Sequence, residues 1–505
     1  MSARVAKAGT WGFAGRTILL LANFAATPFT IRLLGPSAYG LWALIQAVLV
    51  WAGLAEGGMW AATTKYGAER YADGDATGEA MVVWSGLAFV LTTTSSVALA
   101  LALGAHLLLA LLHVGSGLLG AGMWALRLSC AAFVVGALAG TVNTTQEVRL
   151  RWRQYTLINL VSNLVGSVGV PLAIYLMSGG LVAAAAVGLL ASSLNLFGLS
   201  WDGVRVQPAL LRPRADRATL RKLLRYGGVL TIANFAGIPL ATGERFFLGA
   251  NVSTTAVAYY AVAATVATTL LVLPEQLTSP LMPALARLEA EGKAEEHRAL
   301  YGKSLSGLFL VATPAALLVA LIAKPFLTLW AGPSYGAHST APLLIALGGV
   351  WVNALAWVAG SYLLSAAKTK VLAWLQAAEL APYLGAAWVL TAKWGVLGAA
   401  IVWSARVAID SVARLVIVHR IAGLPWLPLS ARRVRSVAAP VLLAVACRGA
   451  AGLTGGLIAR SAIAALLLAA YCVGVWWLVL TARERRGVAN LLSEMLGRNV
   501  RVQPS

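Results

Sequence analysis

Residues 81–104 read MVVWSGLAFVLTTTSSVALALALG, a run without a single charged side chain. About 20 apolar residues are enough for an α-helix to cross the hydrocarbon core of a bilayer. The whole chain has the same character, since 59% of its 505 residues are hydrophobic and only 11% are charged. A soluble domain carries roughly 25% charged residues. The composition therefore predicts an all-α polytopic membrane protein.

Further apolar runs on either side of this one predict about fourteen transmembrane helices. Each run has the length that a membrane-spanning helix requires. The expected spans are 10–32, 38–62, 81–104, 122–143, 155–177, 180–201, 226–249, 256–282, 304–324, 340–364, 371–391, 395–418, 437–456 and 461–481. An even number of spans places both termini on the same side of the membrane.

Basic residues are distributed unevenly among the predicted loops. The formal net charge is +21, with the long 202–225 connection and the C-terminal tail both rich in arginine, while the opposite loops hold few basic residues. Cytoplasmic loops characteristically carry this excess of lysine and arginine. The pattern predicts that both termini lie in the cytoplasm. It also argues against nucleic acid as a partner, because basic charge would then form a continuous patch.

An internal repeat predicts two lobes. Residues 22–28 read ANFAATP and residues 233–239 read ANFAGIP, and ordered polar matches follow at offsets near 211–220. The copies are six helices apart and so share an orientation, which predicts two six-helix lobes related by a pseudo-two-fold axis along the membrane normal, with a cavity between them. The expected organisation is an N-lobe at 1–201, a basic linker at 202–225, a C-lobe at 226–418, and a helix pair with a basic tail at 419–505.

Eleven charged residues fall inside the predicted spans. Each costs roughly 2.5–3.5 kcal/mol at the bilayer centre, so these residues are expected to pair with one another or to line water. They are Arg16, Glu56, Arg127, Glu244, Arg245, Glu275, Glu379, Arg406, Asp410, Arg414 and Arg448.

The spacing of these charges leaves two readings open for several of them. Arg406, Asp410 and Arg414 recur every four residues, so they share one helix face. That face is either a salt-bridged strut or a charged stripe along the cavity. Glu379 has no charged partner nearby in sequence, and it is either a hydrogen-bonded structural acid or a residue that titrates or holds a cation.

Two arginines are the candidate anion ligands. Arg16 lies early in the first span, with Asn23 two turns further along, and a guanidinium fork matches two oxygens of a pyrophosphate. Glu244 and Arg245 are adjacent, so they are expected to point to different sides of their helix. Pro239 precedes them and predicts a kink or break. A broken helix beside a charge pair is a common binding-site signature in transporters.

Sequence motifs for catalysis and cofactors are missing. No GxxxxGK[ST], HExxH or CxxC occurs, and the five histidines and three cysteines are scattered. The predicted external loops contain no aspartate or glutamate, which argues against a membrane polymerase or ligase working with carboxylates on that face. We expect no enzyme, no cofactor and no metal, and binding and movement remain as the function.

Several motifs resemble those of the polysaccharide-exporter family of lipid-linked oligosaccharide flippases. They are IRLLGPSAYGLWAL at 31–44, the LAEGG and TTKYGAERYADGD stretches after it, and SPLMPALARLEAEGK at 279–293. That family belongs to the multidrug/oligosaccharidyl-lipid/polysaccharide exporter superfamily. Its fourteen helices, two six-helix lobes and C-terminal pair match this chain along its whole length.

The resemblance implies a flippase that moves an undecaprenyl-pyrophosphate-linked oligosaccharide from the cytoplasmic to the periplasmic leaflet. On that model the head group enters a cationic cavity, the lipid tail stays among the membrane lipids, and two lobes rock to give alternating access. Arg16 and Arg245, beside Glu244, would hold the pyrophosphate, and Asn23, Gln46 and Asn234 would bind sugar hydroxyls. Proton or sodium coupling would use Glu275, Glu379 or Asp410. Polysaccharide polymerase or export machinery would be a further partner.

Two alternatives stay open, and a third is argued against by the charges. A lipid II flippase of peptidoglycan synthesis is also fourteen-helical and lined by arginine. An ion-coupled multidrug exporter normally has twelve helices and an acidic cavity. A purely structural scaffold would not need eleven charges within its spans.

Overall fold

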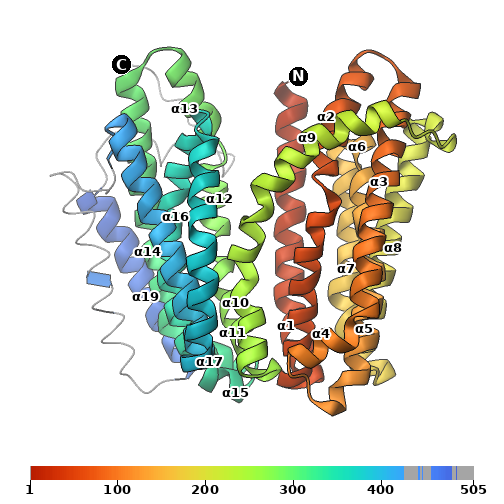
Figure 1. Ribbon diagram of the computed structural model, residues 1–505. Helices are drawn as coiled ribbons and strands as arrows, with labels where there is room; N and C mark the ends of the chain where they lie inside the picture. Colours follow the sequence, from red (N-terminus) through yellow and green to blue (C-terminus); the bar gives the residue numbers. More distant parts are fainter. Residues whose placement is uncertain (1, 426–441, 444–445, 447–455, 480–484, 486–505) are drawn as a thin grey trace. The chain divides into compact units, whose positions relative to one another are not determined.

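A computed structural model describes residues 2–425, 442–443, 446, 456–479 and 485, with the backbone alone at 2–14, 16, 230, 232–234 and 478–479. Every regular element in these residues is a helix (Figure 1). The 28 residues of Ala76–Leu103 span about 42 Å at 1.5 Å per residue, enough to cross a bilayer. The predicted all-α polytopic membrane fold is confirmed. Nine regions of the described chain are long and apolar enough to cross a membrane: Thr17–Ala72, Ala76–Leu103, Ser116–Val148, Trp152–Met177, Gly180–Val206, Thr254–Ala290, Ala294–Trp330, Thr340–Ser365 and Leu457–Trp477.

These nine regions hold ten of the fourteen predicted spans, because Thr17–Ala72 contains the first two. Predicted span 226–249 lies on two helices, and spans 371–391 and 395–418 share one long helix with several charged residues. Predicted span 437–456 and Arg448 fall largely outside the described residues.

The chain packs into two compact units, the first formed by residues 1–262 and 376–402. In the first unit α8 packs along both α5 and α7, and α1 packs along α7. Its helices are α1 (Ser2–Ala52), α2 (Met59–Ala72), α3 (Ala76–Leu103), α4 (Ala105–Leu111), α5 (Ser116–Val142), α6 (Thr144–Val148), α7 (Trp152–Met177), α8 (Gly180–Val206), α9 (Arg217–Phe235) and α10 (Gly237–Asn251), with the start of α11 (Thr254–Thr269) and the middle of α17 (Thr369–Ala422). The lobe boundaries expected from the sequence repeat remain a prediction.

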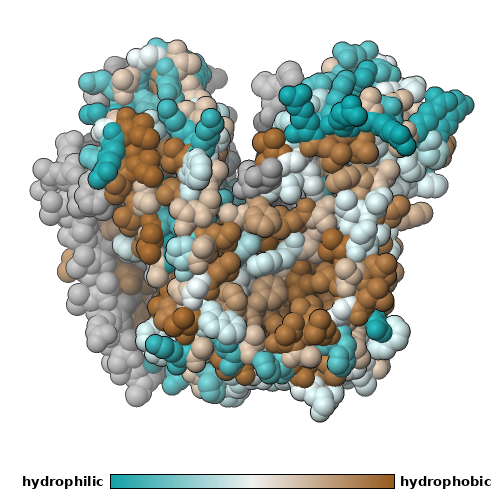
Figure 2. Space-filling model, viewed as in Figure 1, coloured by the Kyte–Doolittle hydropathy of each residue, from teal (hydrophilic) through white to brown (hydrophobic). Residues whose placement is uncertain are grey.

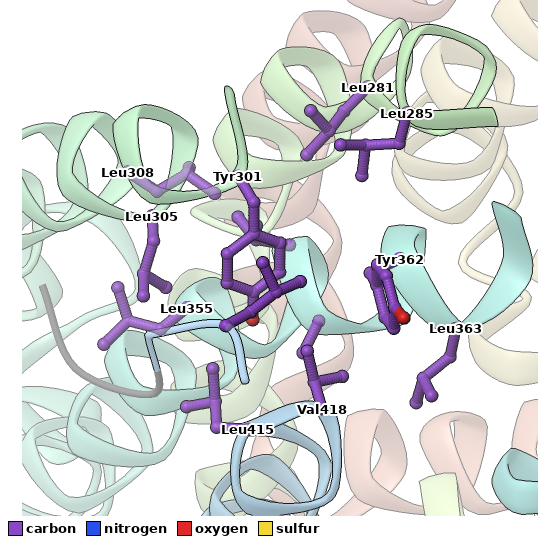
Figure 3. Close-up of a cluster of buried hydrophobic side chains, with 13 residues drawn as sticks. Leu281, Leu285, Tyr301, Leu305, Leu308, Leu355, Tyr362, Leu363, Leu415 and Val418 are labelled. Atoms are coloured by element: carbon purple, nitrogen blue, oxygen red, sulfur yellow. The ribbon is translucent and has the colours of Figure 1, made fainter. Parts of the chain in front are cut away.

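The second unit comprises residues 263–375 and 403–505. Its core is a cluster of leucines around two tyrosines, Tyr301 and Tyr362, whose ring centroids lie 6.2 Å apart in an edge contact (Figure 3). This cluster joins α13, α14, α16 and the end of α17. The helices of the unit are α12 (Val272–Thr278), α13 (Leu281–Ala290), α14 (Ala294–Trp330), α15 (Pro333–His338), α16 (Thr340–Ser365) and α19 (Leu457–Gly474), with the ends of α11 and α17.

Large apolar side chains face outward along many of the helices. Leu103, Tyr175, Met177 and Phe197 are each more than two-thirds exposed. Figure 2 shows hydrophobic side chains across the middle of the helices and hydrophilic ones gathered toward the helix ends. A soluble monomer does not expose so much contiguous apolar surface, and lipid is the solvent that accounts for it.

Single glycines replace two of the predicted loops. Gly35 within α1 has φ 76°, and Gly395 within α17 has φ 55°. Positive φ is readily adopted only by glycine, so each of these residues reverses or bends the chain without a loop of its own. Helix α17 therefore contains two of the predicted spans, and α1 contains the first predicted span and the beginning of the second.

The basic 202–225 connection is largely ordered. Helix α8 continues to Val206, and α9 begins at Arg217, directly after Asp216. That carboxylate accepts hydrogen bonds from the backbone N–H of Thr219 at 2.7 Å and from its hydroxyl at 2.9 Å. Because both bonds favour the ionised form, the backbone one foremost, they lower the pKa of Asp216. Asp216 is thus the N-cap of α9.

Helix α9 also meets a double glycine that interrupts the second predicted span. Gly57 and Gly58 have φ 63° and 64°, and they separate the short 3₁₀ turn Gly53–Glu56 from α2. A Cβ on Gly58 would lie 2.5 Å from the carbonyl oxygen of Gly227, and a Cβ on Gly227 would lie 2.4 Å from that of Gly57. Two backbones therefore touch here with no side chain between them.

We expect Gly227→Ala to destabilise the protein by about 1–3 kcal/mol, since a methyl group would have to displace the backbone of a neighbouring turn. Gly228→Ala is the matched control, because a Cβ at that adjacent position meets nothing within 4 Å. Alanine should there be neutral or slightly stabilising for the helix. Thermal unfolding of both purified variants checks this, and equal melting temperatures would contradict the close approach of the two backbones.

Candidate functional site

A charge pair on α10 lies inside the first unit. The break at Ala236 between α9 and α10 falls three residues before Pro239, which confirms the predicted interruption of this helix. Glu244 is 1% exposed, and its carboxylate accepts a hydrogen bond from the hydroxyl of Tyr383 on α17. The Nε of Arg245 lies 3.8 Å from Glu244 Oε1. The adjacent residues were expected to point apart, but the long, flexible arginine side chain turns back toward the acid.

The guanidinium of Arg245 has few hydrogen-bond partners among the described residues. Its Nε is buried without a hydrogen-bond partner among the described residues, while the whole side chain is 24% exposed. A distance of 3.8 Å to one carboxylate oxygen exceeds that of a charge-assisted hydrogen bond, which is about 2.7–2.9 Å. Arg245 therefore keeps most of its donor capacity for an anionic ligand.

Contacts with α1 fix the position of α10. The indole Nε1 of Trp51 donates to the hydroxyl of Thr242 at 2.9 Å, and the Trp51 ring meets Phe246 edge-on at 5.2 Å. Both partners lie within one turn of Arg245. A rigid neighbour of this kind holds a charged side chain in place before a ligand arrives.

The same contact continues toward α11. Ser37 and Thr254 share a hydrogen bond of 3.1 Å between their hydroxyls, and a Cβ on Gly40 would lie 1.7 Å from the carbonyl oxygen of Thr254. The SAYG sequence at 37–40 thus has a physical role. Its serine bonds to the N-terminal end of α11 and its glycine lets the two backbones approach.

A second polar site, the polar pocket, lies in the first unit among α5, α7, α8 and the start of α2. It has a volume of about 430 Å³, which is within the usual range of ligand sites. Its polar and aromatic lining consists of Glu56, Trp60, Asn143, Tyr155, Asn159, Ser162, Asn163, Ser192 and Asn195.

Glu147 on α6 lies behind this pocket. Its carboxylate accepts hydrogen bonds from Trp60 Nε1 at 3.1 Å, Asn143 Nδ2 at 2.9 Å and Thr64 Oγ1 at 2.8 Å. All three donors are neutral. The carboxylate is thus held by hydrogen bonds alone within the described residues, and it ties α2 to the end of α5.

The predicted substrate ligands are only partly described. The side chains of Arg16 and Asn234 lie outside the described residues. Asn23 is exposed on α1, and its Oδ1 accepts a hydrogen bond from Ser167 at 2.6 Å. Gln46 is exposed on the same helix. Asn23, Gln46, Glu244 and Arg245 all belong to the first unit, and their role in binding substrate remains a prediction.

The three candidate coupling acids are divided between the units. Glu379 is half-buried and belongs to the first unit, and Glu275 is half-buried and belongs to the second. Asp410, in the second unit, is 2% exposed and pairs with both Arg414 Nε at 2.9 Å and Arg414 Nη2 at 2.7 Å. Asp410 and Arg414 thus form a salt bridge, which was one of the two interpretations of this helix face. Arg406 is half-buried on the same helix.

The sequence analysis did not identify the polar pocket. Its signal is a spacing of four residues, which places side chains one above another on a helix. Asn143 and Glu147 have this spacing, as do Tyr155, Asn159 and Asn163. The amides carry no charge, and Glu147 lies in a predicted loop, so neither stands out among the charges within the predicted spans. No cluster of three or more His, Cys, Asp or Glu side chains with the geometry of a metal site occurs in the described part of the chain.

Apolar helices that cross a membrane, with charged and amide side chains buried among them, define a polytopic membrane transporter. The chain belongs to the family described as polysaccharide biosynthesis protein, whose model matches residues 30–339. The resemblance noted in the sequence is thereby confirmed.

Individual relatives agree with this family. A Shigella flexneri protein named "Putative O-antigen transporter" is 25% identical over 420 residues, covering 81% of this chain and 96% of its own. The lipid II flippase MurJ in an inward closed conformation has a TM-score of 0.68 at 12% identity, covering 98% of this chain and 100% of its own. An inward-facing multidrug resistance MATE family transporter of the MOP superfamily has a TM-score of 0.66 at 14% identity, covering 80% and 94%. The solved structures share the fold of this chain.

Proposed function

We propose that this protein is a flippase that moves an undecaprenyl-pyrophosphate-linked oligosaccharide from the cytoplasmic to the periplasmic leaflet for the synthesis of a surface polysaccharide. The observation that carries the proposal is Arg245, a guanidinium within a membrane protein whose Nε has no hydrogen-bond partner among the described residues. A permanent cation among membrane-spanning helices is energetically costly unless an anionic or polar partner compensates its charge. A pyrophosphate would supply the two oxygens that its fork is built to bind.

Membership of the polysaccharide biosynthesis family supports this proposal, as does the name of the Shigella flexneri relative. An O-antigen precursor is a lipid-linked glycan, so its carrier must accept an anionic head group and polar sugars together. Alternating access, cytoplasmic termini in a bacterial inner membrane, and coupling to protons or sodium through Glu275, Glu379 or Asp410 are further parts of the proposal.

A lipid II flippase is the second candidate function. It is favoured by the match to MurJ, which extends over 98% of this chain, whereas the match to the MATE transporter extends over 80%. Lipid II also carries a pyrophosphate, so Arg245 would serve either substrate in the same way.

Deletion of the gene in its host separates these functions. We expect viable cells that lose one surface polysaccharide and accumulate its undecaprenyl-linked unit, measured by mass spectrometry of extracted lipids. Lysis with accumulation of lipid II would instead assign the protein to peptidoglycan synthesis. Unchanged pools in a strain without a related transporter would reject both functions, and drug export would then be tested.

A further inference from the structure

The amide groups around the polar pocket have fixed orientations. Asn143 is 3% exposed, and its Nδ2 donates to the carboxylate of Glu147. An ionised carboxylate only accepts hydrogen bonds, so the NH₂ end of Asn143 must face Glu147. Its Oδ1 is then turned away from Glu147, and this atom is buried without a partner in the described residues. A buried acceptor left unpaired is destabilising, and a ligand that donates a hydrogen bond would recover that cost.

Three further asparagine side chains are also held in fixed orientations by hydrogen bonds. Asn159 donates through Nδ2 to the backbone carbonyl of Tyr155 at 3.0 Å, which leaves its Oδ1 to accept from Asn195 Nδ2 at 3.0 Å. Asn163 donates to the carbonyl of Asn159 at 2.8 Å. In both Asn163 and Asn195 one amide N–H is thus used within the protein, and the side-chain carbonyl oxygen accepts no hydrogen bond from the described residues.

The pocket is therefore rich in acceptors. They include amide oxygens and the carboxylate of Glu56, and no lysine or arginine occurs among its lining residues in the described chain. A phosphate brings only acceptors and negative charge, so this lining disfavours it. Ligands that suit the lining are those rich in hydroxyl or amide hydrogen, or cations.

Size and shape favour a sugar over a bare ion. A volume of about 430 Å³ is far larger than an ion needs, and ligand sites of this size hold small organic molecules. Trp60 is 54% exposed and lines the same pocket. An aromatic ring with hydrogen-bonding amides around it offers an apolar face and polar edges together, which matches the two kinds of surface on a pyranose ring.

We propose that the polar pocket is a subsite for a neutral sugar unit of the transported glycan, separate from the arginine that holds the pyrophosphate. This inference rests on the proposed flippase function and adds to it the part of the protein that recognises the carbohydrate. Glu147 is a positioning residue in this account, because it acts on the ligand only through the orientation of Asn143.

The experiment compares two lipids on the full-length protein in nanodiscs. One is the undecaprenyl-linked oligosaccharide extracted from the host, and the other is undecaprenyl pyrophosphate without sugar. We expect the wild type to bind the glycosylated lipid more tightly. Asn195→Leu and Asn163→Ala should each reduce that preference about fivefold, the effect of losing one neutral hydrogen bond. Affinity for undecaprenyl pyrophosphate should not change.

Two variants protect the test against misfolding. Asn163 is exposed, so its truncation should leave the fold intact even if Asn195→Leu disturbs the bond to Asn159. Ser193→Ala is the matched control, because Ser193 is exposed on α8 beside Ser192 and does not line the pocket. It should bind both lipids like the wild type.

Three other outcomes would overturn either the sugar subsite or the proposed function. A preference for the glycosylated lipid that survives in both pocket variants would overturn the sugar subsite and leave the flippase proposal standing. Loss of sodium binding in the variants, measured with ²²Na⁺, together with an intact sugar preference would make the pocket a cation site and also overturn the inference. Failure of the wild type to bind either lipid would reject the proposed function itself.

Discussion

Replacing Arg149 with leucine should lower the free energy of unfolding by about 3–5 kcal/mol, the cost of leaving a buried charge without its partner. Glu79 at the start of α3 is 1% exposed, and it receives two hydrogen bonds from Arg149, at 2.5 Å from Nη1 and 2.9 Å from Nη2. Gln207 donates a third at 3.0 Å. Without the guanidinium, the carboxylate must be protonated or exposed to water. Thermal unfolding of the purified protein measures the loss.

The chain provides a matched control for this pair. Arg70 and Asp75 also lie 3.0 Å apart, but their side chains are 46% and 38% exposed. Such a pair contributes about 0–1 kcal/mol, so Arg70→Leu should hardly change the melting temperature. Adding Glu79→Gln to Arg149→Leu should recover much of the stability. Equal effects of Arg149→Leu and Arg70→Leu would contradict the buried ion pair.

Arg245→Ala should weaken the binding of undecaprenyl pyrophosphate by at least about a hundredfold. Two charge-assisted hydrogen bonds to the ligand at about 1.5–3 kcal/mol each would be lost, and about 1.4 kcal/mol corresponds to a factor of ten. Arg245→Lys should lose part of this affinity, because an ammonium keeps the charge but not the planar fork. Titration of the protein in nanodiscs with radiolabelled undecaprenyl pyrophosphate measures both variants.

Two controls separate binding from folding. Arg127 also lies in a predicted span, but its side chain is exposed and stacks on Trp124 with a distance of 5.3 Å to the ring centroid. Arg127→Ala should leave affinity unchanged. Combining Arg245→Ala with Glu244→Gln removes the buried acid that would otherwise be left with its charge. If this double variant bound the lipid normally, the arginine would serve only to balance Glu244.

The sequence predicted the fold well because apolar length is a property of one segment at a time. The run at 81–104 lies entirely within α3 but for its last residue, and the break before Pro239 occurs as expected. Less predictable was the absence of loops at Gly35 and Gly395. A single residue with positive φ can end one span and begin the next, and hydropathy averaged over a window does not detect it.

The candidate site was less accessible to sequence reasoning. Charged residues stand out in an apolar chain, so Glu244, Arg245 and Asp410 were found. Their partners were not all found, since Tyr383 is 139 positions from Glu244 and no spacing rule connects them. The polar pocket depends on contacts among four separate helices. Asparagine is common enough at helix ends and turns that four of them do not mark a site until the helices are assembled.

The contact of Gly227 with the Gly57–Gly58 turn consists of backbone atoms on both sides. Interlocked side chains must exchange rotamers before two helices can slip past one another, and each exchange adds a barrier. A surface of bare backbone has no rotamers to exchange. Because no rotamers have to exchange at this contact, it adds little barrier of its own to a small displacement of α9 against the start of α2.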